Sequence, residues 1–341
     1  MSEFVTLDEI RAARERISGV TIRTPLYRVE RARLRMAKLP EPEFDLYIKA
    51  ESEQPIGSFK LRGAFNMVSQ LSPEARSRGV ITYSSGNHAQ GVAYAARALG
   101  TKAVIVMPSN APAVKKAATR ALGAEIVEVG PASSERRLKA EELVAEFGYA
   151  MIPPYDAPEI IAGQATCGLE IVEQLPDVDL VISPVSGGGL LSGVATGIKL
   201  AAREGLASAG VQVWGAEPEL AADAHESFYA KKLVEWPAEK TVRTIGDGLR
   251  TQSLGTLNFE HVLRFVDGIV TVSEEEIFAS MRVILTATKL VAEPSGAVTL
   301  AAALFHAGEL PKARKVAVIL SGGNLEPSLR EKLDAEIAQA K

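Results

Sequence analysis

Short runs of apolar and β-branched residues alternate along the chain with alanine-rich stretches that have helical periodicity. The runs predict strands over residues 46–49, 80–83, 103–107, 126–129, 180–183, 211–214 and 316–320. Before the first strand, Thr6 followed by Glu9 forms a capping box and predicts an amphipathic helix that ends at about Ile17. Strands that alternate with helices are typical of βαβ units, so we expect an α/β fold with parallel sheets covered by helices.

Two proline-containing segments interrupt this alternation, one over residues 72–79 and one over residues 152–158. The strand-helix units between them read as a compact block. If the chain crosses between domains at both ends of the block, residues 78–154 form a small domain, and residues 1–77 together with 155–341 form a large domain.

The composition is that of a globular protein, with 341 residues of which 47% are apolar and 23% are charged. This length leaves room for two domains. Cys167 is the only cysteine, which excludes an intrachain disulfide and a cysteine-based zinc site and favours a reducing compartment. Because the N-terminus lacks the basic start and apolar run of a secretory signal, a cytoplasmic location is expected.

The charges are nearly balanced, with a formal net charge of -4 and no run of five or more basic residues. This balance argues against a nucleic acid or an anionic membrane as the main partner. The longest apolar-looking stretch, residues 180–200, contains five glycines and a lysine, so no membrane-spanning helix is predicted. A small molecule is therefore the expected ligand.

Three of the predicted strands open into polar loops that contain glycine, over residues 84–91, 186–190 and 321–324. Ligands of parallel α/β sheets bind outside the carboxyl ends of the strands, so these loops are expected to line one crevice. The glycines at 187–189 let main-chain N–H groups approach an anion, and the following helix offers its positive end, so a phosphate fits there. The alternative is that these glycines only form a tight turn.

The sequence lacks several common cofactor and catalytic motifs. A dinucleotide fingerprint that started at Gly187 would need a glycine where Ser192 stands, and the chain has no glycine-lysine P-loop. The four histidines form no i, i+4 pair, and no Gly-x-Ser-x-Gly elbow is present, which argues against zinc-hydrolase and serine-hydrolase chemistry. Lys60, between Phe59 and an apolar helix, is a candidate Schiff-base nucleophile, with an ordinary surface lysine as the alternative.

Taken together, four segments resemble a known family: residues 58–64 (SFKLRGA), 84–88 (SSGNH), 186–190 (SGGGL) and 321–324 (SGGN). Their order and spacing are similar to those of the pyridoxal-phosphate enzymes of fold type II, and in particular of the serine/threonine dehydratase (threonine ammonia-lyase) and serine racemase family. The resemblance extends from about Thr21 to Asn324. It implies two parallel-sheet domains of the tryptophan synthase β-like architecture, and a homodimer or homotetramer.

The resemblance also implies a cofactor site. Lys60 is expected to bind pyridoxal 5'-phosphate as a Schiff base, Phe59 to pack against the ring, and Asn87 to bond the ring hydroxyl. The residues expected to hold the phosphate are Ser186, Gly187, Gly188, Gly189 and Leu190. Ser321 is expected to face the pyridine nitrogen, where a hydroxyl does not keep that nitrogen protonated as a carboxylate would, and this favours elimination of a β-substituent.

The substrate carboxylate is expected at a helix start formed by Ser84, Ser85, Gly86, Asn87 and His88. Lys60 is the expected base for the α-proton, and Ser85 matches the residue that acts on the opposite ring face in the racemase. The implied reaction is β-elimination and deamination of L-threonine or L-serine to a 2-oxo acid and ammonia. Serine racemisation stays open, as does dehydration of 3-hydroxyaspartate, because Ile56 stands where the family commonly has threonine.

A cation site is implied by the segment that follows the strand near Val211. Glu217 and Asp223, with the main-chain oxygen of Ala221, match the family's ligands, and hard oxygen ligands suit Mg²⁺ or another divalent cation such as Ca²⁺. The alternative is a solvated turn that carries two acids.

Other classes fit less well. A sulfhydrylase of the cysteine-synthase type is less expected, because His88 and Ala89 replace the threonine-glycine pair that follows the asparagine there. Retention of Lys60 and Ser321 argues against a cofactor-free binding protein. The chain ends 17 residues after Asn324, which leaves no room for a regulatory domain, so a catabolic role is expected.

Overall fold

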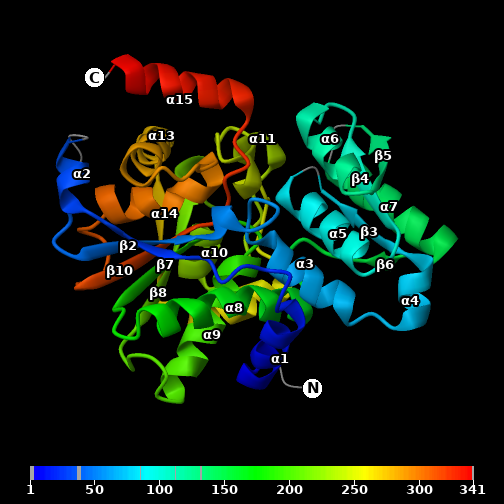
Figure 1. Cartoon of the computed structure of the whole chain (residues 1–341), viewed down its shortest axis with the longest axis horizontal. Helices are drawn as coiled ribbons and strands as arrows, with labels where there is room; N and C mark the ends of the chain where they lie inside the picture. Colours follow the sequence, from blue (N-terminus) through cyan, green and yellow to red (C-terminus); the bar gives the residue numbers. More distant parts are fainter. Residues whose placement is uncertain (1–3, 37–39, 85, 112, 131–132, 340–341) are drawn as a thin grey trace.

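The computed structural model describes residues 4–36, 40–84, 86–111, 113–130 and 133–339, and it contains two sheets that lie side by side (Figure 1). Over these residues, six strands form a large sheet in the order β1-β2-β10-β7-β8-β9, and four strands form a small sheet in the order β5-β4-β3-β6. Every strand pairing is parallel except that of β1 with β2. The predicted α/β fold with parallel sheets is confirmed.

The large sheet consists of β1 (Leu26–Val29), β2 (Asp45–Ala50), β7 (Leu180–Pro184), β8 (Gln212–Pro218), β9 (Gly268–Val272) and β10 (Lys315–Leu320). The small sheet consists of β3 (Val80–Tyr83), β4 (Ala103–Pro108), β5 (Glu125–Val129) and β6 (Ala150–Met151). The α-helices are α1 (Leu7–Ile17), α2 (Arg31–Met36), α3 (Lys60–Ser69), α4 (Pro73–Arg78), α5 (Asn87–Ala98), α6 (Ala113–Ala121), α7 (Ser133–Phe147), α8 (Pro158–Gln174), α9 (Gly189–Arg203), α10 (Asp223–Ala230), α11 (Ala238–Thr241), α12 (Thr256–Phe265), α13 (Glu274–Val283), α14 (Pro294–Phe305) and α15 (Pro327–Gln339). Short 3-10 turns are η1 (Glu51–Glu53), η2 (Glu219–Ala221) and η3 (Asp247–Leu249), and η4 (Ile284–Thr288) is a π-helix.

The N-terminal helix forms as its capping box predicts. The hydroxyl of Thr6 accepts the N–H of Glu9, and the Glu9 carboxylate accepts the N–H of Thr6, so the first turn of α1 has its free donors paired. The segment over residues 72–79, predicted as a link, is instead a short helix, α4. Pro73 lies in the first turn of α4, where a main-chain N–H would have no partner within the helix, so the missing N–H of proline costs nothing. The hydroxyl of Ser72 accepts the N–H of Ala75.

The order of the strands along the chain separates the two sheets. The small sheet uses only strands between residues 80 and 151, whereas the large sheet uses strands on both sides of that block. In Figure 1 the elements β3 to β6 lie to one side of the large sheet, and α3 lies between the two. The domain limits at residues 78 and 154 stay a prediction.

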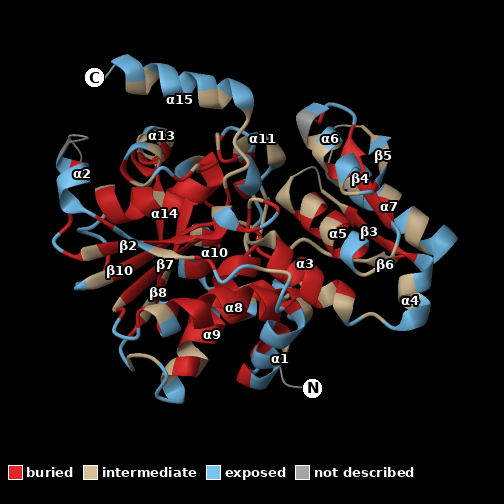
Figure 2. Cartoon of the chain, in the orientation of Figure 1, coloured by how far each residue is buried: buried red, intermediate tan, exposed pale blue. Residues whose placement is uncertain are grey.

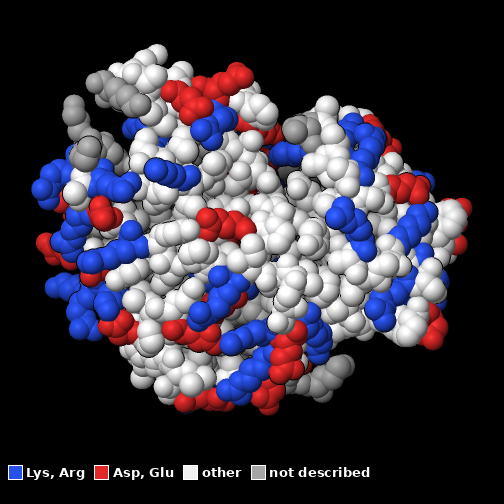
Figure 3. All heavy atoms as spheres, viewed as in Figure 1, with Lys and Arg blue, Asp and Glu red and all other residues white. Residues whose placement is uncertain are grey.

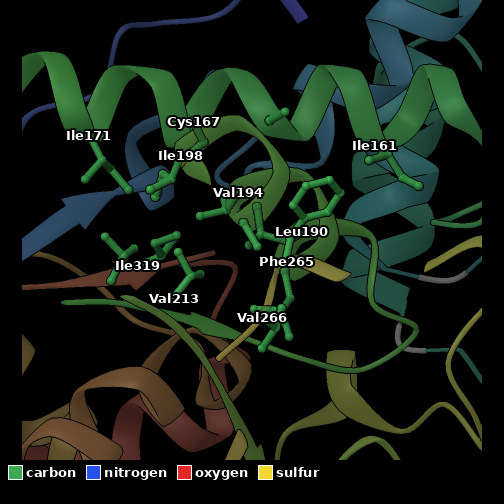
Figure 4. Packing of buried hydrophobic residues seen from close by; sticks show 14 of the residues in the cluster. Ile161, Cys167, Ile171, Leu190, Val194, Ile198, Val213, Phe265, Val266 and Ile319 are labelled. Atoms are coloured by element: carbon green, nitrogen blue, oxygen red, sulfur yellow. The ribbon is translucent and has the colours of Figure 1, made fainter. Parts of the chain in front are cut away.

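Helices cover both faces of the large sheet, and the core lies between them (Figure 2). Neighbouring residues of β10 alternate between the two faces: Ile319 belongs to the core under α8 and α9, and Val318 belongs to the core under α13 and α14. Figure 4 shows Ile171 of α8 and Ile198 of α9 beside Ile319. Cys167 is buried in the same core as a free thiol.

The distribution of charged side chains over the surface agrees with the nearly neutral net charge of the chain. On the face drawn in Figure 3, basic and acidic side chains are intermixed around the rim, and much of the area between them is uncharged. None of the helices in the described residues combines the length and the hydropathy that a membrane span requires.

Candidate active site

Lys60 is the first residue of α3, and the chain before it is fastened to the carboxyl end of β10. Ser58 forms an isolated antiparallel bridge with Gly322, and the N–H of Phe59 donates to the main-chain oxygen of Ser321 over 3.1 Å. The predicted Schiff-base lysine and the predicted partner of the ring nitrogen are therefore held in one place by main-chain bonds.

The amine of Lys60 points to the segment that leaves the small sheet. Its Nζ atom donates to the main-chain oxygen of Pro154 over 2.7 Å and lies 5.2 Å from the centroid of the Phe59 ring. No carboxylate pairs with this amine in the described part of the chain, and burial lowers the pKa of Lys60 to about 8. With this pKa about a tenth of the Lys60 amine is neutral at pH 7, and the neutral amine can attack an aldehyde. The bond to Pro154 argues against the alternative of an ordinary surface lysine.

The glycine loop lies between β7 and the start of α9, as expected. A Cβ atom at Gly187 would lie 2.4 Å from the ring of Tyr155, and Gly188 has a φ of 93°, which other residues rarely adopt. Main-chain N–H groups at the first turn of α9 are free to receive an anion. Because Tyr155 follows Pro154, one short segment contacts both Lys60 and the glycine loop.

The predicted substrate loop leads from β3 into α5, which begins at Asn87 with Gly86 as its N-cap. The hydroxyl of Ser84 accepts the N–H of Gly86 over 3.4 Å. Ser85, the expected second catalytic residue, lies outside the described residues. His88 is buried and its Nε2 atom lies 3.0 Å from the main-chain oxygen of Ile152, so its ring faces the protein and only its main chain is available at the helix start. Burial, and then the charge of Lys60, lower the pKa of His88 to about 3.

The side chain of Asn87 bonds to Glu293 and Asn324, and the sequence motifs do not predict either contact. Its Nδ2 atom donates to Glu293 over 2.6 Å, and its Oδ1 atom accepts from Asn324 over 2.7 Å. Ser321 is buried, and its Oγ atom lies 3.5 Å from the main-chain oxygen of Ser295. Glu293 carries no motif signal, because a glutamate before a proline at a helix start reads as an ordinary cap.

These residues fit pyridoxal phosphate. The absence of a side chain at Gly187 lets the Tyr155 ring pack against the loop, the adjacent helix start suits a phosphate, and Lys60 supplies a buried amine of lowered pKa for the aldehyde. The expected roles of the individual residues stay predictions.

The predicted cation residues form a buried pair rather than a solvated turn. Glu217 is the next-to-last residue of β8 and accepts the N–H groups of Ala224 and His225 over 3.2 and 2.8 Å. Both carboxylate oxygens of Asp223 are buried without a hydrogen-bond partner in the part of the chain described, and Ala221 is fully buried beside them in η2. Burial and then the Asp223 charge raise the pKa of Glu217 above its ordinary range, and burial raises the pKa of Asp223 to about 7. Among the described residues, no cluster of three or more His, Cys, Asp or Glu side chains could hold a metal ion.

Comparisons with known proteins agree with this site. The chain is 44% identical over 281 residues to L-threo-3-hydroxyaspartate ammonia-lyase of Saccharomyces cerevisiae, covering 82% of this chain and 83% of that protein. It is 37% identical to serine racemase of Schizosaccharomyces pombe, covering 94% of both chains. The solved structure of a threonine deaminase from T.th. superposes with a TM-score of 0.85 at 44% identity, covering 94% of this chain and 99% of that one. The family model of the pyridoxal-phosphate dependent enzymes matches residues 17–322, and the chain belongs to this family.

Proposed function

We propose that this protein deaminates a small 3-hydroxy L-amino acid, L-threonine or L-serine, by β-elimination to a 2-oxo acid and ammonia. The observation that supports this most directly is the position of the Lys60 amine, which has a pKa of about 8 and lies next to the glycine loop through Pro154 and Tyr155. The identity to ammonia-lyases and to a threonine deaminase supports the same reaction class.

Bound pyridoxal phosphate supplies an electron sink for the bond that breaks at the substrate's α-carbon. In this proposal the N–H groups at the first turn of α9 bind its phosphate, Phe59 packs on the ring, and the hydroxyl of Ser321 faces the ring nitrogen. Main-chain N–H groups at the start of α5 bind the substrate carboxylate, with Ser84 beside them. The Lys60 amine takes the α-proton, which its lowered pKa allows near neutral pH.

A second candidate substrate is L-threo-3-hydroxyaspartate, and Arg136 favours it. The Nε atom of Arg136 is buried without a hydrogen-bond partner among the described residues, and burial lowers the pKa of this guanidinium. Arg136 lies in the first turn of α7, which follows β5 at the same edge of the small sheet as the loop that follows β3. A carboxylate on the substrate's β-carbon would supply the missing partner.

The test compares kcat/KM for L-threonine, L-serine and L-threo-3-hydroxyaspartate, and follows D-serine in parallel. If Arg136 recognises the β-carboxylate, R136Q lowers kcat/KM for hydroxyaspartate about a hundredfold and leaves L-threonine within about threefold. The control is R120Q, because the exposed Arg120 of α6 pairs with the exposed Glu128. Equal losses of kcat/KM on both substrates would contradict this role of Arg136. If D-serine is the main product formed from L-serine, the proposed reaction changes from elimination to racemisation through Ser85.

We also propose that Glu217, Asp223 and the main-chain oxygen of Ala221 bind Mg²⁺ or another divalent cation. The carboxylate of Asp223, buried and without a hydrogen-bond partner in the part of the chain that the structure describes, supports this. A homodimer or homotetramer and a cytoplasmic location complete the proposal, and sedimentation velocity tests the assembly.

A further inference from the structure

Glu293 is a buried carboxylate that the roles given above do not use. It precedes α14, but its side chain makes no capping bond to that helix. Its Oε1 atom instead accepts a hydrogen bond of 2.6 Å from Nδ2 of Asn87, and its N–H donates to the main-chain oxygen of Gly322 over 3.1 Å. Glu293 therefore joins the start of α5 to the loop that follows β10.

The carboxylate has little freedom to move. A Cβ atom built at Gly322 would lie 2.0 Å from Oε1 of Glu293 and 3.2 Å from Nδ2 of Asn87, so both polar groups pack directly over this glycine. Ser321, the residue expected to face the pyridine nitrogen, immediately precedes that glycine. The contact thus lies within the predicted cofactor site.

The bonds of Asn87 define the orientation of its amide group. Its Oδ1 atom accepts from Nδ2 of Asn324 over 2.7 Å, while its own Nδ2 donates to Glu293. Nδ2 of Asn324 also donates to the main-chain oxygen of Ile56 over 2.9 Å, which fixes Asn324 as the donor. A flipped Asn87 amide would place N–H against N–H on one side and oxygen against a carboxylate on the other. Among the described residues, one N–H of Nδ2 has no partner in this arrangement.

We propose that Glu293 is a positioning residue of the cofactor site, which holds the Asn87 amide so that its remaining N–H donates to the ring oxygen of pyridoxal phosphate. The proposal rests on the cofactor site put forward above, and it is independent of the substrate. Without the carboxylate, one of the two bonds that orient the amide is lost, and an amide that flips presents its oxygen, which cannot donate to that ring oxygen.

The charged groups that face Glu293 are Asp247 of η3 and Lys115 of α6, and Lys115 also pairs with Glu326. Burial and then the Asp247 charge raise the pKa of Glu293 to about 7, against the opposing effects of Asn87 and Lys115. A hydrogen-bond acceptor remains at this position in either protonation state, so the orienting role does not depend on the charge.

The test measures the affinity of the apo-protein for pyridoxal phosphate by absorbance titration, without any substrate. E293A is expected to weaken binding about tenfold, because one neutral hydrogen bond to the ring oxygen is lost, whereas E293Q keeps an acceptor and stays within about threefold. The control E326Q removes a carboxylate that bonds Lys115 and not Asn87, and it should stay within about twofold.

A double-mutant cycle separates orientation from general damage. On an N87A background, E293A should cause no further loss, because there is no amide left to orient. An equal tenfold loss on both backgrounds would overturn the positioning role, as would unchanged binding by E293A. If E293A does not fold, the cycle is run with E293L, which has a similar volume and no acceptor. Failure of the wild-type protein to bind the cofactor would instead refute the cofactor site itself.

Discussion

The Nζ atom of Lys60 lies 2.7 Å from the main-chain oxygen of Pro154, so the amine at the start of α3 is bonded across to the segment that leaves the small sheet. Its only polar partner in the described structure is uncharged, and nothing offsets the desolvation that lowers the pKa of Lys60 to about 8.

This environment predicts the pH dependence of cofactor attachment. Only the neutral amine attacks the aldehyde, so the second-order rate should rise about tenfold per pH unit below pH 8 and level off above it. Stopped-flow absorbance of the apo-protein mixed with pyridoxal phosphate measures this rate, with K60R as the variant that does not attach. A rate that rises through pH 10, as for an ordinary lysine, would contradict the lowered pKa.

The glycine loop predicts a steric effect with a specific rescue. In G187A the new methyl group would lie 2.4 Å from the Tyr155 ring, so the loop or the ring must move, and affinity for pyridoxal phosphate should fall about tenfold or more. G308A, where a Cβ atom meets nothing within 4 Å, is the matched control and should bind normally. Adding Y155A to G187A should restore part of the affinity, and an equal loss in the double variant would show that the ring is not the obstacle.

The sequence predicted the central strands well and the edge strands poorly. β2, β3, β4, β7, β8 and β10 have neighbours on both sides and read as apolar runs, because both faces of such strands are covered. The missed strands β1, β6 and β9 all lie at sheet edges, whereas the edge strand β5 was predicted. β9 is mostly buried, so exposure does not account for its omission. Tyr27 and Arg28 in the middle of β1 are exposed, and β6 contains only Ala150 and Met151, so neither has the pattern of a buried strand.

The candidate site contains residues that a local sequence motif predicts and residues that only a long-range contact reveals. Lys60 and the glycine loop belong to contiguous motifs, so the sequence was sufficient to propose them, and residues 154–155 contact both in the structure. Glu293 gains its position only when segments far apart in the sequence meet. For Glu293 the partner is 206 residues away, and no periodicity or spacing signals such a contact.

The buried acidic pair predicts stabilisation by a divalent cation. Two carboxylates without a cation between them oppose folding, so Mg²⁺ or Ca²⁺ at about a hundred times its Kd should add about 2.7 kcal/mol to the free energy of unfolding. D223N should be more stable than the wild type without a cation and should lose the cation effect, whereas E219Q, at an exposed carboxylate in η2, should keep it. Thermal unfolding with and without chelator measures both, and an equal cation effect in D223N would contradict the site.

The buried ion network beneath α3 predicts a large stability effect two residues from Lys60. The Arg62 guanidinium bonds both oxygens of Glu51, each over 2.8 Å, and both oxygens of Glu170, over 2.7 and 2.9 Å. Lys49 completes the network by donating to Glu170 over 2.6 Å. R62M would leave two buried carboxylates with one cation and should cost about 3–5 kcal/mol in urea unfolding at pH 7. R330A, which breaks the exposed pair with Asp334, should cost less than about 0.5 kcal/mol.

The same network predicts acid sensitivity with a definite sign. Burial alone would raise the pKa of the Glu51 carboxyl, but the Arg62 charge and hydrogen bonds outweigh it and lower this pKa to about 2. A carboxylate whose pKa is lower in the folded state stabilises the fold fully above its unfolded value, near 4.5, and loses this contribution as the pH falls toward 2. The free energy of unfolding should therefore fall between pH 5 and pH 2 more steeply for the wild type than for E51Q. Parallel pH profiles for the two proteins would show that Glu51 is not ionised in the folded state and that Arg62 draws its stability from Glu170 alone.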